Sequence, residues 1–183
     1  MSGREAAIKK KTEEIRLAVS TLKRRLKVGD DSNPLSWIVL GKLACAPRPL
    51  RYHPLYGGSG NLLPTSATAF IFAWVREIQG AGIKSVISLM HDRDWRCYAS
   101  LDLRAASLHD FYEQQGFEVA AVPYEDPHHK KSTLAEKRKT LLRVRQDALA
   151  AYDMLTKPVL VQCSAAWDRS PPVAAFIYVM RGL

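Results

Sequence analysis

The chain has 183 residues, 47% of them hydrophobic and 25% charged, which is the composition of one globular domain and not of a disordered or fibrous protein. Three cysteines without regular spacing argue against a secreted disulfide scaffold, and the scattered histidines argue against a structural zinc site. No apolar run approaches the roughly 20 residues that a bilayer-spanning helix needs, and the first residues lack the apolar core of a secretory signal. We therefore expect a cytoplasmic protein, or a nuclear one in a eukaryote, with no transmembrane segment.

The net charge of +9 is concentrated in two segments and favours anionic partners. Residues 1–27 carry nine basic and three acidic side chains, and residues 130–145 carry seven basic side chains and one acidic one, a local charge of +6 in each case. Either segment could bind RNA or an anionic surface. A solvated helix face explains the same pattern equally well.

The first predicted element is a basic amphipathic helix over residues 4–27. A single apolar stripe at helical spacing supports it and consists of Ile8, Ile15, Val19, Leu22 and Leu26. A Gly-Asp-Asp-Ser-Asn-Pro run at residues 29–34 then breaks the pattern. We therefore divide the chain into residues 1–33, the helix and its linker, and residues 34–183, the main domain.

Strands and helices are expected to alternate along the rest of the chain. β-branched and apolar runs predict strands at 37–40, 42–45, 84–90, 117–122 and 158–162. Helices are predicted at 66–79, at 108–115, from a capping box at 133–136 to about 155, and after residue 170. Residues 46–65 and 91–104 are expected to be loops. This order predicts an α/β fold with a central, mainly parallel sheet of about four to five strands flanked by helices.

The most informative stretch is residues 159–170, VLVQCSAAWDRS. An apolar strand ends at Cys163, a five-residue loop comes next, and Arg169 stands just before a helix that Ser170 opens. Backbone N–H groups of such a loop, at a helix N-terminus, can hold a tetrahedral oxyanion and favour the thiolate form of a cysteine. A guanidinium adds a planar fork for two phosphate oxygens.

Spacing alone is weak evidence, because Cys45 and Arg51 repeat the interval between Cys163 and Arg169. In the segment 45–51, Pro47 and Pro49 remove two of the amides that a phosphate would need, and no helix starts after it. We therefore do not expect a second phosphate loop there. We expect the catalytic group to be Cys163.

The segment 163–170 resembles the signature loop of the cysteine-dependent protein tyrosine phosphatases, H-C-x-x-G-x-x-R-S/T, and is most similar to that of the small atypical dual-specificity phosphatases. Residues 36–44, 82–89 and 123–126 also resemble parts of that branch, so the likeness covers about residues 36–181. Two positions depart from the pattern: Gln162 stands where the family usually has His, and Ala166 stands where it has Gly.

The resemblance implies a two-step phosphoryl transfer without cofactor or metal. Cys163 would attack phosphorus and form a cysteinyl-phosphate, and Ser170 would hydrogen-bond the sulfur and help it leave. Asp126 would be the general acid and base, with Glu125 the first alternative and Asp168 the second. The phosphate-binding residues would be those of the loop: Ser164, Ala165, Ala166, Trp167, Asp168 and Arg169.

The implied substrate is a phosphorylated protein, and the implied fold is that of the protein tyrosine phosphatases. An RNA 5′-phosphatase of the same superfamily is the first alternative, which the basic segments favour. A phosphate-binding pseudophosphatase is the second, suggested by Gln162 and Ala166. Because family members commonly continue with one or two further helices, residues 34–183 could lack the C-terminal helices of the domain.

Overall fold

A computed structural model describes residues 3–58, 60–128 and 131–183. Its centre is a five-stranded sheet in the order β1-β2-β5-β3-β4, in which only β1 is antiparallel to its neighbour. The strands are β1 (Ser36–Val39), β2 (Leu43–Pro47), β3 (Ser85–Ser88), β4 (Glu118–Ala121) and β5 (Val159–Cys163). The predicted α/β architecture, with a mainly parallel sheet of about four to five strands flanked by helices, is confirmed.

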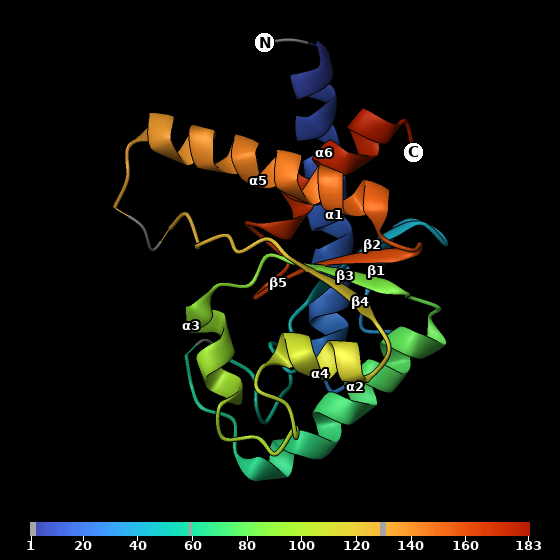
Figure 1. Cartoon of the computed structure of the whole chain (residues 1–183), viewed down its shortest axis with the longest axis vertical. Coiled ribbons are helices and arrows are strands. Elements are labelled where there is room, and N and C mark those ends of the chain that lie inside the picture. The colour runs from blue at the N-terminus through green and yellow to red at the C-terminus, as the bar shows by residue number, and fades with distance from the viewer. Residues whose placement is uncertain (1–2, 59, 129–130) are drawn as a thin grey trace.

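Helices cover both faces of this sheet (Figure 1). They are α1 (Gly3–Lys27), α2 (Thr68–Gly80), α3 (Asp92–Trp95), α4 (Leu108–Gln114), α5 (Leu134–Met154) and α6 (Ser170–Arg181), with 3₁₀ turns η1 (Thr65–Ala67) and η2 (Arg96–Tyr98). Helices α5 and α6 lie on one face, and α2 and α4 lie on the other. β5 is buried along its whole length, because it is the central strand and both faces are covered.

The stripe of apolar residues on α1 is buried as predicted. Ile8, Ile15 and Val19 join the core formed by α5, α6 and one face of the sheet, and α1 packs mainly on α6. The basic side chains remain largely on the outer face of the helix. The N-terminal helix therefore shares its core with the domain that comes after it.

The capping box that opens α5 is also present. The Glu136 amide donates to Thr133 Oγ1 at 3.2 Å, and the Thr133 amide donates back to Glu136 Oε2 at 2.8 Å. These two bonds satisfy amides that the first turn of a helix leaves free. They fix where the helix starts.

The expectation that residues 91–104 form a polar loop is wrong. They contain α3 and η2, and Cys97 and Tyr98 are buried in the apolar cluster that includes residues of α2 and α4. A turn of four residues is too short to show helical periodicity, so the sequence pattern misses it. The His91 amide, which donates to Asp94 Oδ2 at 2.9 Å, closes this turn.

Within the described part of the chain, no helix is both long and apolar enough to cross a membrane.

Candidate active site

A pocket of about 390 Å³ is lined by residues that come after the carboxyl ends of β5, β3 and β4 and by the segment after β2. Ligand sites of open α/β sheets commonly lie at this edge. Seven of the residues named from the sequence meet in its lining: Glu125, Asp126, Cys163, Ser164, Ala165, Asp168 and Arg169.

Cys163 ends β5 at the base of this pocket and is 1% exposed. Its sulfur lies 3.2 Å from Ser170 Oγ, and Ser170 is the first residue of α6. A serine hydroxyl at this distance can donate a hydrogen bond to a thiolate and stabilise it. The amides of the loop and the start of a 12-residue helix add positive potential on the same side.

Arg169 is held in one orientation by Asp94, a residue that no sequence pattern indicated. Nη1 donates to Asp94 Oδ2 at 2.6 Å and Nη2 donates to Asp94 Oδ1 at 3.1 Å, and Nη1 also donates to the Tyr124 carbonyl at 3.0 Å. Burial acts to raise the pKa of Asp94, but the hydrogen bonds and charge of Arg169 outweigh it, so the pKa lies below its ordinary value. The pair therefore stays ionised at neutral pH.

This pairing leaves part of the guanidinium for a ligand. The hydrogen bonds to Asp94 and Tyr124 use Nη1 and one side of Nη2. The Nε–H and the second Nη2–H have no protein partner among the described residues. An arginine has five N–H donors in a fixed plane, so these two form an edge that can meet two phosphate oxygens.

The two positions that depart from the family pattern have clear structural settings. Ala166 has a φ of 53°, the left-handed conformation that glycine adopts more easily, so its methyl group is carried at a steric cost. Gln162 is buried on the opposite face of β5 from Cys163. There it accepts a hydrogen bond from Tyr112 Oη at 3.2 Å and donates to the Pro47 carbonyl at 3.4 Å.

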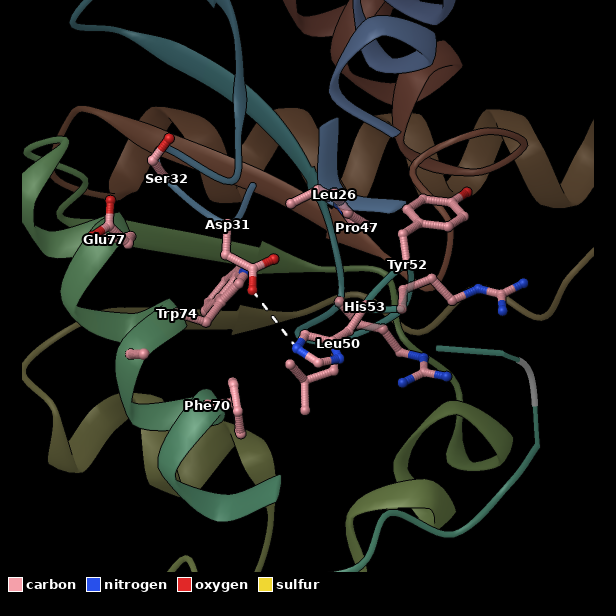
Figure 2. A pocket seen from close by; sticks show the side chains of 13 residues that line it. Leu26, Asp31, Ser32, Pro47, Leu50, Tyr52, His53, Phe70, Trp74 and Glu77 are labelled. Atoms are coloured by element: carbon pink, nitrogen blue, oxygen red, sulfur yellow. Dashed lines mark ion pairs between the residues drawn. The ribbon is translucent and has the colours of Figure 1, made fainter. Parts of the chain in front are cut away.

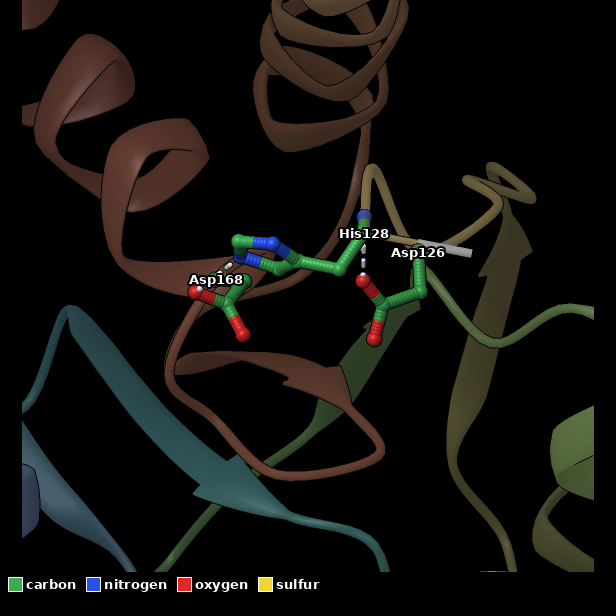
Figure 3. Close-up of side chains that lie close together, drawn as sticks. All are labelled: Asp126, His128 and Asp168. Atoms are coloured by element: carbon green, nitrogen blue, oxygen red, sulfur yellow. Dashed lines mark hydrogen bonds and ion pairs between the residues drawn. The ribbon is translucent and has the colours of Figure 1, made fainter. Parts of the chain in front are cut away.

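The candidate general acid lies in a cluster with His128 and Asp168 (Figure 3). Asp126 Oδ1 accepts a hydrogen bond from the His128 amide at 2.9 Å, and His128 Nε2 lies 3.4 Å from Asp168 Oδ1. The ligand atoms of these three residues lie within 4.8 Å of one another, a set that a divalent cation could share. The contact between His128 and Asp168 ties the loop of Asp126 to the loop of Cys163.

Two predicted phosphate-binding residues are not in the pocket lining. Ala166 is a fully buried residue of the loop. Trp167 is 39% exposed and faces α1, where Arg16 Nε donates to its carbonyl oxygen at 3.2 Å and the Arg16 guanidinium lies 5.9 Å from its ring. Only the backbone amides of these residues remain as candidates for contact with phosphate.

The segment after β2 supports the Cys163 loop, a role that the sequence did not reveal. The Arg48 amide donates to the carbonyl oxygens of Cys163 at 2.9 Å and Ser164 at 3.2 Å, and its Nε donates to Ser164 Oγ at 3.3 Å. Tyr52 Oη donates to the Ala165 carbonyl at 2.9 Å. Parallel pairing of β2 with β5 places these residues beside the loop, but nothing local in the sequence indicates that pairing.

The two basic segments lie on α1 and on or before α5, and Lys130 is outside the described residues. They are not wholly solvated: Arg145 is buried, donates to the Pro172 carbonyl at 3.2 Å and pairs with Glu5 at 3.3 Å. This contact joins α5 to α1. Most other basic side chains of these helices are exposed.

No family model matches the chain, and no curated protein sequence matches it. A function is therefore inferred from the chemistry of the pocket.

Proposed function

We propose that this protein is a phosphomonoester hydrolase that works through a cysteinyl-phosphate. The observation that carries the proposal is the meeting of three groups in one pocket: the Cys163 thiol at its base, the free edge of Arg169, and the Asp126 carboxyl. These are a nucleophile, an anion-binding fork and a proton donor. Together they are the groups that transfer of phosphate to a thiol requires.

In the first step, the Cys163 thiolate attacks phosphorus and forms an S–P bond while the P–O bond to the leaving group breaks. Asp126, protonated, gives its proton to the departing oxygen. The amides of the loop and the N–H groups of Arg169 bind the three remaining phosphate oxygens as charge is redistributed. Ser170 holds the sulfur through the hydrogen bond at 3.2 Å.

In the second step, Asp126, now a carboxylate, takes a proton from a water molecule that attacks phosphorus. The S–P bond breaks, inorganic phosphate forms, and Cys163 returns to the thiolate, which the Ser170 hydroxyl stabilises. The cycle restores the proton on Asp126. It uses residues of the pocket, Ser170 beside the sulfur, and water.

Asp94 has a positioning role in this scheme. Its carboxylate takes one edge of the Arg169 guanidinium and turns the other edge toward the pocket. Without it, the guanidinium would have to be ordered when substrate binds, and that ordering would cost side-chain entropy. Asp94 therefore acts through Arg169 and not on the substrate.

The finer proposal is a dual-specificity protein phosphatase, with the fold of the protein tyrosine phosphatases. It rests on the likeness of residues 163–170 to that family's loop. The exposed basic side chains of α1 and α5 favour an RNA 5′-phosphatase as the second candidate. Side-by-side hydrolysis of a phosphotyrosine peptide, a phosphothreonine peptide and a 5′-phosphorylated RNA would decide between them.

The activity itself is tested with nitrophenyl phosphate. We expect Cys163→Ser to abolish hydrolysis and to retain vanadate binding, because the anion cradle remains while a hydroxyl is a far weaker nucleophile. Cys45→Ser, a matched change in the neighbouring strand, is expected to retain activity. Turnover by Cys163→Ser, or loss of activity in Cys45→Ser alone, would refute the proposal. Vanadate binding without wild-type turnover would indicate the pseudophosphatase.

A further inference from the structure

Arg51 lies at the boundary between the Cys163 pocket and a second cavity of about 200 Å³, and it lines both. Phe70 and Trp74 of α2 form part of the wall of the second cavity, and His53 points toward Asp31 across it at 3.9 Å (Figure 2). The proposed mechanism does not use Arg51. Arg51 is nevertheless one of the charged residues that line the site.

The loop that carries Arg51 is held by several backbone hydrogen bonds. The amide of Gly57 donates to the His53 carbonyl at 2.7 Å, and the amide of Gly58 donates to the Arg51 carbonyl at 3.2 Å. A Cβ at Gly57 would lie 2.5 Å from the His53 oxygen, so this close approach requires glycine. His53 Nδ1 also accepts from the amides of Leu55 and Tyr56. Arg51 is therefore presented at a fixed place relative to the cysteine loop.

The two arginines of this segment have different surroundings. Each guanidinium nitrogen of Arg48 donates a hydrogen bond, to Ser164 Oγ, Tyr98 Oη and the Gly58 carbonyl. Arg51 Nε is buried and has no hydrogen-bond partner, and Arg51 forms no ion pair with a described residue. Burial and then the nearby charge of Arg48 lower the pKa of Arg51 below its ordinary value. An anion beside Arg51 would offset both the loss of solvation and the repulsion from Arg48.

We propose that Arg51 forms a second anion subsite next to the cysteine pocket, for substrates that carry a second phosphate group close to the one that is hydrolysed. The first phosphate has its own ligands, which are the loop amides and Arg169. A further guanidinium that is partly desolvated, has no ion-pair partner among the described residues and is held on a braced loop is suited to another anionic group. This inference rests on the proposed function for the identity of the first site.

The test compares the affinities of phosphate, pyrophosphate and tripolyphosphate for the full chain carrying Cys163→Ser, measured by calorimetry. We expect that pyrophosphate or tripolyphosphate, whichever binds more tightly, binds at least about tenfold more tightly than phosphate. An added hydrogen bond to a charged group accounts for a gain of this size. Adding Arg51→Gln is expected to remove most of that preference and to change phosphate affinity little. Arg51→Lys, which keeps the charge and loses the fork, is expected to give an intermediate preference.

Two control variants make the result specific. Arg76→Gln changes an exposed arginine of α2 and should keep the preference. Arg93→Gln changes another arginine of the pocket lining and should keep most of it. The inference is overturned if Arg93→Gln removes the preference instead, if Arg51→Gln weakens phosphate and the longer anions equally in a protein of unchanged melting temperature, or if no preference exists.

These outcomes are separate from those of the proposed function. The measurement is of binding and uses a protein without the nucleophile, so it can succeed or fail whatever the turnover of the wild-type protein. Failure of the proposed function shows as absent hydrolysis of nitrophenyl phosphate. Failure of this inference shows as no preference for the longer anions, or as a preference that does not depend on Arg51.

Discussion

Residues 45–51 and 163–169 have the same spacing of cysteine and arginine and lie side by side, yet the structure gives them different settings. β2 and β5 are parallel neighbours, and the register pairs Cys45 with Val161 and Pro47 with Cys163. Cys45 is therefore two residues inside the sheet, where burial raises the pKa of its thiol well above the ordinary value. Cys163 stands at the strand end, where the pocket begins.

The residues after each cysteine separate the two segments further. After Cys163 the chain turns through five residues that keep their amide hydrogens and enters α6. After Cys45 it passes two prolines and continues into an irregular segment that braces the Cys163 loop through Arg48 and Tyr52. A Cys-to-Arg interval thus has chemical meaning only where the cysteine ends a strand and a helix begins beyond the arginine.

The largest effect is expected from the arginine of the functional segment. Arg169→Lys should lower kcat/KM for nitrophenyl phosphate by at least about a hundredfold, because an ammonium cannot replace the planar fork at a developing charge. Steady-state kinetics measures this. Arg181→Lys is a matched control, since Arg181 pairs with Asp153 on the surface and is remote from the pocket. Similar losses in both variants would show a general structural effect.

The next effect concerns the proton donor. Asp126→Asn should lose about 10²–10⁴-fold in rate on alkyl phosphates such as phosphoserine and much less on nitrophenyl phosphate, whose leaving group needs little protonation. The measurement is the ratio of kcat values for the two substrates. Glu125→Gln should leave the ratio unchanged. If Glu125→Gln changes the ratio and Asp126→Asn does not, Glu125 is the acid, and if neither does, Asp168 is the next candidate.

A third prediction uses pH to examine the pairing that orients Arg169. Because the pKa of Asp94 is lowered by folding, its ionised form stabilises the protein above the unfolded-state pKa of about 4, and the contribution is lost as pH falls through the folded-state pKa. Asp94→Asn should therefore reduce the free energy of unfolding at pH 7 by about 1.5–3 kcal/mol. We expect a value near the lower end of this range, because Asn keeps one hydrogen-bond acceptor.

Urea unfolding at pH 7 and at pH 3 measures this dependence. The difference between the wild-type protein and Asp94→Asn should be largest at pH 7 and should shrink toward pH 3. A difference that is equal at both pH values would mean that the ionised pair contributes nothing, and that Asp94 matters only for its packing.

The smallest effect is expected at Ala166, the strained residue of the Cys163 loop, and Leu50, a strained residue of the other segment, is its contrast. Ala166 and Leu50 both have positive φ, 53° and 61°. Ala166→Gly relieves about 1–2 kcal/mol of backbone strain and loses about 0.8 kcal/mol of methyl burial, so stability should rise by about 1 kcal/mol or less. Leu50→Gly removes a large buried side chain and should destabilise the protein by about 2–4 kcal/mol. Thermal unfolding of both variants checks the opposite signs.

The sequence was informative where structure is set by neighbours along the chain. The α1 stripe, the capping box at Thr133, and the strand, loop and helix around Cys163 are all predictable from local patterns. The residues that were missed depend on contacts between distant segments. Asp94 belongs to a four-residue turn without periodicity, and it meets Arg169 across 75 residues of sequence. Arg48 and Tyr52 reach the loop only because β2 pairs with β5, which lies far along the chain.

The most direct test of the central claim is to trap the intermediate. The wild-type protein and Ser170→Ala, in which the sulfur should leave more slowly, would be mixed with nitrophenyl phosphate, quenched rapidly, digested and examined by mass spectrometry. We expect a phosphate group on the peptide that carries Cys163, more abundant in Ser170→Ala, and none on the peptides that carry Cys45 or Cys97. Hydrolysis that proceeds with no phosphate on Cys163, or with phosphate on another residue, would contradict a cysteinyl-phosphate mechanism at this site.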